Sequence, residues 1–479
     1  MAILSGSCPS CGAPIEFQVG TSVAKVCEFC KATVYRTDRG LEDLGKVAAI
    51  ANVPSLIAVG DSGKLGGRSF TVLGRVQLDH GKGPWDEYYV SYADGSGWLA
   101  YAEGIWYATS ESDRAIDVPD FESLRIEADV PLGEAGTFRV TEIKTARVAS
   151  AEGEIPGGSL PGTARSYADL HGRNDGFATI DYGDRTRRHE VYLGRRFDER
   201  DLEIVEAGPR TAAKVKTDTI RCPNCGGDMP KLAGERAERI GCRYCGAVSD
   251  IAAQTVIARQ EASMATPPIP IGARGRIGDV TWCSIAYLQR SADIEGERFA
   301  WEEMLLFAEG AGFRWLVKDE TTWLFVDPVN IAELDLGGMP AVARYRGAGF
   351  RLRNRSTARV DYVLGEVYWK CEVGELVRTS DYVRGTEVLS REETPGEVRW
   401  SHSQAIPWPV LARAFDVSTG AAGGRFSTGG FGWEMNAGAI LAIVIVVVVV
   451  LALASALRDF DSGGGAPVYG GSGWYYGGK

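Results

Sequence analysis

The sequence predicts a mainly β protein in which one unit occurs twice: a small cysteine-rich ribbon followed by an antiparallel β barrel or sandwich. A single transmembrane helix is predicted near the C-terminus. Three observations predict this organisation: four Cys-x-x-Cys pairs, an internal repeat with a shift of 212 to 217 residues, and an uncharged apolar run of 21 residues. Together these features account for most of the 479 residues.

The overall composition is that of a globular protein with sizeable cores, because hydrophobic residues make up 45% and charged residues 24% of the chain. The 60 glycines favour many turns, as in short-stranded β structure. The net charge of −11 argues against wrapping nucleic acid as the main role, since phosphate binding needs an excess of Lys and Arg. A locally basic patch remains compatible with these totals.

The first ribbon is predicted over residues 1–40 and its copy over 207–250. Each has two Cys-x-x-Cys pairs, separated by 15 residues in the first ribbon and by 16 in the second. Four thiolates in two such knuckles form a closed tetrahedral site that suits zinc. The predicted ligands are Cys8, Cys11, Cys27 and Cys30 in the first ribbon and Cys222, Cys225, Cys242 and Cys245 in the second.

A structural metal is the expected staple of each ribbon. A segment of roughly 40 residues buries too little surface to fold unaided. Zinc supplies roughly 10–16 kcal/mol to such a site, whereas a disulfide supplies about 2–4 kcal/mol. Rubredoxin-like iron and redox dithiols are the alternatives. Four protein ligands leave no open coordination position, so the ribbons are not expected to catalyse a reaction.

The repeat extends well beyond the ribbons. Residues 57–70 align with 269–282, Trp98 and Trp106 align with Trp315 and Trp323, and Gly153-Glu154 recurs as Gly365-Glu366. We therefore expect one β domain over 41–206 and a second over 269–416, with a linker over 251–268. The shared tryptophans are interpreted as core residues.

Period-2 alternation predicts the strands. In "EVYWKCEV", Val367, Trp369, Cys371 and Val373 face one way, and in "GFRLRNRS" the apolar residues oppose Arg351, Arg353 and Arg355. A short helix is expected from Leu41, because Leu41, Leu44, Val47 and Ala48 share a helical face.

Residues 437–457 form the predicted transmembrane helix, since 21 residues without a charge span about 30 Å. A buried core helix is the alternative. A Gly-rich tether over 417–436 precedes the helix, and a Gly/aromatic tail over 458–479 follows it. The N-terminus lacks the basic and apolar regions of a secretory signal, and reduced thiols suit the cytosol. We expect a single-pass protein of the inner (cytoplasmic) membrane with its domains in the cytosol.

No catalytic or organic-cofactor site is predicted. The chain has four histidines and lacks the Gly-x-Ser-x-Gly, P-loop and Rossmann motifs. Cys283 and Cys371 are expected to be inert buried thiols.

The paired segments "YYVSYADGSGWLAYAEGIWYAT" and "LLFAEGAGFRWLVKDETTWLFV" resemble the bacterial domain-of-unknown-function family numbered 4178. The resemblance is carried by Trp98-Leu99 and Trp315-Leu316 and by the tryptophans that follow them. It implies tandem domains, each preceded by a zinc-ribbon-like module, and it implies no activity or catalytic residue. Members look like accessory proteins encoded beside small membrane proteins and polyamine-synthesis-like enzymes.

These features favour a membrane-anchored, cytosol-facing binding or scaffold protein whose partners are other membrane or cytosolic proteins and not nucleic acid. One alternative is an enzyme or enzyme subunit with a site in a β-domain cleft, using acidic residues such as Glu87 or Asp94. Another is a sensor of a small cationic metabolite such as a polyamine, with acidic and aromatic surfaces.

Overall fold

The computed structural model describes the chain in twelve stretches: residues 5–17, 24–37, 40–46, 55–80, 84–156, 159–185, 189–206, 219–260, 266–294, 297–319, 322–337 and 341–418. These residues fall in one compact unit that ends at Gly424. The described part of the chain is mainly β, as predicted, with one α-helix, α1 (Trp408–Ala414).

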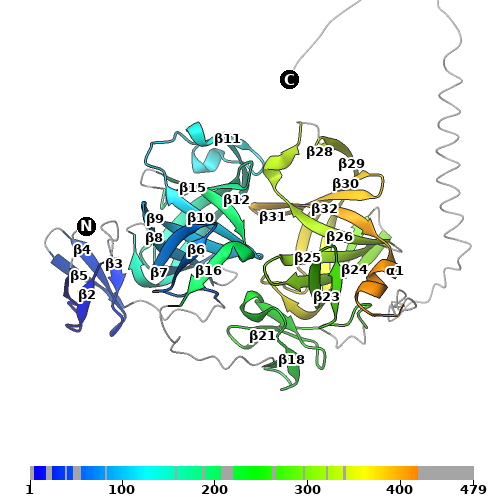
Figure 1. The fold of residues 1–479 in the computed structure, drawn as a ribbon, viewed down its shortest axis with the longest axis horizontal. Helices are drawn as coiled ribbons and strands as arrows, with labels where there is room; N and C mark the ends of the chain where they lie inside the picture. Colours follow the sequence, from blue (N-terminus) through cyan, green and yellow to red (C-terminus); the bar gives the residue numbers. More distant parts are fainter. Residues whose placement is uncertain are drawn as a thin grey trace, which may run out of the picture. The chain divides into compact units, whose positions relative to one another are not determined.

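The first β domain is a closed antiparallel barrel, which we call barrel 1 (Figure 1). Its strands neighbour one another in the order β7, β8, β9, β10, β15, β14, β13 and β12, and β12 pairs back with β7. Their bounds are β7 Arg68–Asp79, β8 Pro84–Tyr92, β9 Gly95–Ala102, β10 Ile105–Glu111, β12 Thr137–Ile155, β13 Ala164–His171, β14 Gly176–Gly183 and β15 Glu190–Asp198. Two four-strand meanders thus close on each other.

Barrel 2 has the same topology in the second β domain. The order is β23, β24, β25, β26, β32, β31, β30 and β29, and β29 pairs with β23. The bounds are β23 Val280–Ile294, β24 Glu297–Ala308, β25 Gly312–Asp319, β26 Thr322–Val329, β29 Ala348–Val367, β30 Leu376–Arg384, β31 Glu387–Thr394 and β32 Glu397–Ile406. Of the two architectures expected, the barrel is therefore the one observed.

Three β-bulges recur in the two barrels and support the repeat independently of sequence identity. The residues skipped in the pairing are Leu73 and Ile285, Thr141 and Arg353, and Ala149 and Asp361. Each pair differs by the same 212 positions. Because a bulge changes which side chains face inward, equal bulges give the two barrels equivalent interior positions.

The ribbons extend the sheets of their barrels. Ribbon 1 contains β1 (Ser5–Ser7), β2 (Pro14–Glu16), β3 (Ala24–Val26), β4 (Ala32–Thr37) and β5 (Gly40–Lys46). Ribbon 2 contains β17 (Thr219–Arg221), β18 (Asp228–Pro230), β19 (Arg239–Gly241), β20 (Ala247–Asp250) and β21 (Thr255–Arg259). Strand β3 pairs with β12, and β19 pairs with β29. Each ribbon is therefore hydrogen-bonded to the longest strand of its own barrel.

Two sequence-based expectations are corrected here. The helix expected from Leu41 is strand β5, which pairs with β4 at the ribbon's edge. A short apolar stripe interrupted by Gly45 makes a poor helix, and the free edge of β4 offers hydrogen bonds instead. Likewise, the linker expected over 251–268 begins with β21, which pairs with β20.

The barrels differ at their C-terminal ends. In barrel 1 a strand, β16 (Leu202–Val205), pairs with β6 (Ser62–Leu65). In barrel 2 the α1 segment takes this place beside β22 (Arg274–Ile277). A Cβ on Gly63 would lie 2.2 Å from Glu203 O, and a Cβ on Gly275 would lie 2.5 Å from the Phe415 ring. The repeated glycine is thus required in both copies, although different elements cover it.

Within the described residues, no helix has both the length and the apolar character needed to cross a membrane. The transmembrane segment predicted at 437–457 lies outside those residues, as do the tail and nearly all of the predicted tether.

Candidate metal centres and the charged barrel interiors

The four cysteines of ribbon 1 come together as predicted. Cys8 Sγ lies 3.7 Å from Cys30 Sγ, and Cys11 Sγ lies 3.7 Å from Cys27 Sγ. All four sulfurs lie within 4.8 Å of one another. A tetrahedron with Zn–S bonds of about 2.3 Å has edges of about 3.8 Å. The sulfur positions therefore fit a tetrahedral metal ion of this size.

Ribbon 2 repeats this geometry. Its sulfur pairs, Cys222 with Cys245 and Cys225 with Cys242, are separated by 3.7 and 3.8 Å. Each Cys-x-x-Cys pair is curled by a tight turn, in which the N–H of the residue after the second cysteine bonds to the carbonyl of the first. Three of these residues are glycines with positive φ, namely Gly12, Gly226 and Gly246, and the fourth is Lys31 at φ +60°.

Each ribbon leaves one cysteine of its quartet exposed, Cys11 in ribbon 1 and Cys225 in ribbon 2, and buries two others. Cys283 and Cys371 are buried and belong to neither cluster, as expected. A closed set of four thiolates is suited to holding a structural ion and has no position for a substrate.

The repeated Gly-Glu dipeptide marks the joint between ribbon and barrel. Glu366 is 1% exposed, and its Oε2 accepts hydrogen bonds from the N–H groups of Leu232 (2.8 Å) and Ala233 (2.7 Å) in ribbon 2. The preceding Gly365 has φ +83°, and a Cβ there would lie 2.2 Å from Ile285 O. In barrel 1, Glu154 is also 1% exposed and follows Gly153, whose Cβ would meet Leu73 O at 2.3 Å.

We expect Glu366→Ala to lower the free energy of unfolding by about 2–4 kcal/mol, because it leaves the buried Ala233 N–H and the partly buried Leu232 N–H without their acceptor. Glu366→Gln keeps an acceptor oxygen and should cost less. Chemical denaturation measures both effects, with Glu372→Ala at an exposed neighbouring position as the control. Equal stability of the Ala and Gln variants would contradict this role.

The interior of barrel 1 contains buried charges. Side chains from β7, β9, β12 and β15 pack together in one apolar cluster. Since these strands lie around the barrel, the side of the sheet that carries this cluster is the barrel interior. Beside it, Arg165 Nε lies 2.9 Å from Asp181 Oδ2, and the Arg165 guanidinium lies 5.8 Å from the Trp98 ring. Glu87 Oε1 accepts a hydrogen bond of 3.4 Å from Trp85 Nε1. Burial raises the pKa of Glu87, and the nearby Arg165 opposes this rise.

Barrel 2 has the same set of charges. In the strand register, Glu303 and Glu392 stand at the positions of Glu87 and Asp181. Arg290 Nη1 lies 3.3 Å from Glu303 Oε1 and 3.1 Å from Glu392 Oε1. Trp301 Nε1 donates to Glu303 at 2.7 Å.

The two arginines come from non-equivalent strands: Arg165 from β13 and Arg290 from β23. We call each set of one arginine and two acids an interior triad. The sequence analysis did not predict these triads. One signal was available, because the pattern Trp-x-Glu occurs at equivalent positions in both copies, as Trp85-x-Glu87 and Trp301-x-Glu303.

The two acidic residues suggested as alternatives for a catalytic cleft lie in different surroundings. Glu87 belongs to the interior triad of barrel 1. Asp94 is exposed at the β8–β9 turn, where it pairs with Arg68 at 2.7 Å. The hydrogen bond from Arg68 lowers the pKa of the Asp94 carboxyl. The paired tryptophans are largely core residues, as interpreted, with Trp106 and Trp323 each 1% exposed.

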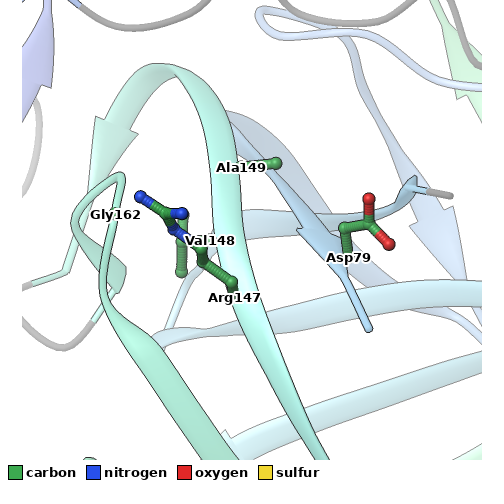
Figure 2. Close-up of a pocket in the computed structure, with 5 residues that line it drawn as sticks. All are labelled: Asp79, Arg147, Val148, Ala149 and Gly162. Carbon is green, nitrogen blue, oxygen red and sulfur yellow. The ribbon is translucent and has the colours of Figure 1, made fainter. Parts of the chain in front are cut away.

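A cavity of about 500 Å³ lies at the surface of barrel 1, lined by Asp79, Arg147, Val148, Ala149 and Gly162. Figure 2 shows the Arg147 side chain directed toward Gly162 and away from Asp79. In barrel 2 the equivalent Arg359 lies 3.6 Å from Asp361, which replaces Ala149.

A cavity of about 240 Å³ in barrel 2 contains a histidine–glutamate pair that the sequence did not reveal. His402 Nε2 lies 2.8 Å from Glu387 Oε2. Hydrogen bonds from Arg384 and His402 lower the pKa of the Glu387 carboxyl. Leu193 occupies the equivalent position to His402 in barrel 1, so the pair is particular to barrel 2.

Acid is expected to destabilise the chain through His171. Burial, with Arg196 nearby, lowers the pKa of His171 to about 3, whereas an unfolded histidine titrates near 6.5. The unfolded chain thus binds more protons between these values, so stability falls as the pH drops below about 6.5. At about pH 5 this linkage amounts to about 2 kcal/mol. His171→Phe should reduce the pH 7 to pH 5 stability loss by about this amount in urea titrations; an unchanged loss would refute the assignment.

Comparison with protein families gives one match. The family model described as "Domain of unknown function (DUF4178)" matches residues 58–199 and again 270–407, which together cover more than half of the chain. The matched ranges coincide with barrels 1 and 2 and exclude both ribbons. No curated protein and no solved structure matches the chain.

Proposed function

Because the chain belongs to the DUF4178 family through both of its barrels, we propose from its own geometry that it is a membrane-anchored, cytosol-facing binding or scaffold protein. Two structural zinc ions would hold its ribbons in shape. The observation that supports a binding or scaffold role is the strand pairing of each cysteine-rich ribbon with its barrel, which would offer ribbon and barrel to partners as one continuous surface.

The zinc assignment is supported by the chemistry of the sites. All eight ligands are thiolates in two sets with tetrahedral spacing. Thiolate-only sets select zinc or iron among the common metals, and a ribbon of this size needs a staple to fold. In each site the cysteines would bind the ion directly and fix the two knuckles, without contributing a reactive group.

The membrane and partner assignments are supported by the sequence. Residues 437–457 contain no charge, and a run of this length favours a transmembrane helix. Its short flanks carry little charge, so the orientation rests on the reduced cysteines. We propose membrane or cytosolic proteins as partners rather than nucleic acid, because the chain is acidic overall.

Two measurements test this proposal. Elemental analysis of the purified chain should find two zinc ions, and protease added to intact cells should leave the ribbons and barrels uncut. Far fewer than two ions with both ribbons folded would refute the zinc assignment. Digestion from the outer face would refute the orientation.

A second candidate function, sensing a small organic cation such as a polyamine, is favoured by the polar residues of barrel 1. Tyr167 donates to Glu142 at 2.9 Å, Thr179 donates to Asp169 at 2.6 Å, and Glu142 already binds one ammonium group, that of Lys144, at 2.9 Å. Carboxylates beside aromatic rings suit ammonium groups. A polyamine should raise the melting temperature of the chain, and Asp169→Asn should abolish that shift. No shift at millimolar polyamine would exclude this function.

A further inference from the structure

Barrel 2 has a polar cavity that the proposed function does not use. It is the cavity of about 240 Å³ that contains the His402–Glu387 pair, and we call it the histidine cavity. Three parts of the barrel enclose it: the hairpin of β28 (Val342–Tyr345) and β29, the hairpin of β30 and β31, and strand β32. Its lining consists of Tyr345, Arg346, Ala348, Phe350, Arg384, Glu387, His402 and Gln404.

The histidine cavity lies outside the barrel and is separate from the interior triad. Glu387 and Glu392 are an odd number of positions apart on β31, so their side chains point to opposite faces of the sheet. Glu392 belongs to the interior triad. The cavity that Glu387 lines is therefore on the outer face, where it opens to solvent.

Contacts on three sides hold the His402 ring in this cavity. Its Nε2 lies 2.8 Å from Glu387 Oε2, and the centroid of the ring lies 5.4 Å from that of Tyr345 and 5.9 Å from that of Phe350. The other carboxylate oxygen of Glu387 accepts a hydrogen bond of 2.7 Å from Arg384. Both oxygens of Glu387 are thus engaged, so this carboxylate positions a histidine and an arginine beside the cavity.

The donors that face a ligand at the rim are mainly cationic. The side chains of Arg346 and Arg384 are 74 and 50% exposed. A guanidinium carries several N–H donors, so the bond from Arg384 to Glu387 leaves others for a ligand. Arg346 has only a distant ion pair, 3.9 Å from Glu333.

The remaining acid near the cavity has another partner. Asp327 lies opposite His402 in the β26–β32 register, and it pairs with Arg314 at 2.5 Å. The lining itself therefore carries two arginines against one glutamate, and it has a positive charge to offer to an anion.

The fold does not require these polar groups, because barrel 1 lacks them. Strand registers place Gly172, Gly176 and Leu193 where barrel 2 has Arg384, Glu387 and His402. A Cβ on Gly172 would lie 2.7 Å from the Phe138 ring, which fills this position in barrel 1. In barrel 2 the Arg384 guanidinium lies 5.6 Å from the equivalent Phe350 ring.

Arg346 is also an unusual choice for its turn. It is the first residue of the two-residue loop between β28 and β29, and its φ is +50°. Asn, Asp or Gly is favoured at this position, because other side chains adopt positive φ less readily. The turn gains nothing from arginine, which favours a role for the side chain at the cavity.

We propose that the histidine cavity binds a small aromatic carboxylate. The guanidinium groups at the rim match the planar fork of a carboxylate, and the Tyr345 and Phe350 rings offer an apolar wall to an aromatic body. Sites for drug-sized ligands have volumes of about 300–1,000 Å³, whereas this cavity has about 240 Å³. The ligand should therefore be about as large as benzoate. The aromatic wall favours such an acid over inorganic phosphate.

Equilibrium dialysis of the purified full chain with radiolabelled benzoate tests the proposal. One site per chain is expected. Benzyl alcohol, which lacks the charge, and inorganic phosphate, which lacks the ring, should each compete about 10-fold more weakly than unlabelled benzoate. Equal competition by benzyl alcohol would overturn the role of charge, and equal competition by phosphate would overturn the aromatic ligand. No binding at millimolar benzoate would overturn the proposal as a whole.

A matched pair of variants tests the rim. R384Q should weaken benzoate binding about 10-fold, because it removes a charged donor. R276Q is the control, since Arg276 is also an exposed arginine that pairs with an acid three residues later, Asp279 at 3.4 Å. It should bind benzoate like the unmodified chain. Equal weakening by both variants would reduce the effect to net charge and refute the site.

A third variant tests the location without changing any charge. Ala348→Leu adds a larger apolar side chain to the lining and should abolish benzoate binding, while a thermal melt checks that the chain stays folded. Unchanged binding by this variant would place the ligand elsewhere.

Amide hydrogen exchange locates the ligand on the unmodified chain. Benzoate should slow exchange in the β28–β29 and β30–β31 hairpins and leave the equivalent residues of barrel 1, 129–139 and 170–178, unchanged. Protection in barrel 1 alone would refute the assignment to barrel 2. Neither the zinc sites nor the membrane anchor takes part in these measurements, so their outcome leaves the proposed function to its own tests.

Discussion

Replacing Cys242 by serine is expected to reduce the zinc content from the proposed two ions per chain to one and to unfold ribbon 2. Cys242 is a buried cysteine of the ribbon 2 cluster. Zinc binding to such a site is worth roughly 10–16 kcal/mol, which is comparable to the total stability of an ordinary domain. Zinc content by elemental analysis and amide exchange over β19–β21 measure the two effects. Exchange in β29 should also accelerate, because β19 hydrogen-bonds to it.

The control for this experiment is Cys371→Ser, which removes a buried thiol that belongs to neither cluster. That variant should keep both zinc ions even if it loses stability. Two outcomes would show that metal does not stabilise the ribbons. In one, the Cys242→Ser protein still holds two ions; in the other, a metal-free chain keeps both ribbons protected from exchange.

Arg165→Met is expected to have the second-largest effect, lowering the free energy of unfolding by about 3–5 kcal/mol. Arg165 is 8% exposed and Asp181 6% exposed. Without the guanidinium, Asp181 and Glu87 remain inside barrel 1 and lose the positive charge of Arg165. Leaving a buried charge without its partner typically lowers the free energy of unfolding by about 3–5 kcal/mol. The variant should recover part of its stability on acidification, because burial raises the pKa of Glu87 and its protonation removes part of the uncompensated charge.

Two comparisons sharpen this prediction, and both use denaturant unfolding. Adding Asp181→Asn to Arg165→Met should restore stability, whereas Asp181→Asn alone should destabilise. Arg290→Met should produce a similar loss in barrel 2. A loss no larger than that of the exposed Arg173→Met would mean that the triad does not stabilise the barrel.

The two cysteine clusters could be predicted from the sequence, because the residues that form each cluster lie close together in the chain. Knuckle spacing fixes which residues can share an ion, and all eight cysteines meet as expected. The repeat likewise predicted which residues would be equivalent, and the shift of 212 positions is kept by three bulges. Alternation correctly indicated sheets with one buried face.

Other features could not be read from the sequence, for physical reasons. Closure of a barrel depends on pairing between β7 and β12, whose residues are far apart in the chain, and alternation is the same in a sandwich. Strand β5 follows from an available edge on β4 rather than from its own periodicity. The interior triads could not be predicted because their arginines lie on non-equivalent strands, β13 and β23. An alignment of the two copies therefore does not place Arg165 opposite Arg290.

The placement of these arginines constrains how the gene can change. The acids are equivalent in the two barrels, but the cation comes from β13 in one and from β23 in the other. Unequal crossing-over that replaced β13 by β30 would leave barrel 1 with no arginine between its acids, and the reverse exchange would give barrel 2 two. Exchange of sequence between the two halves would thus destabilise the product. We therefore expect the two halves to diverge independently of each other.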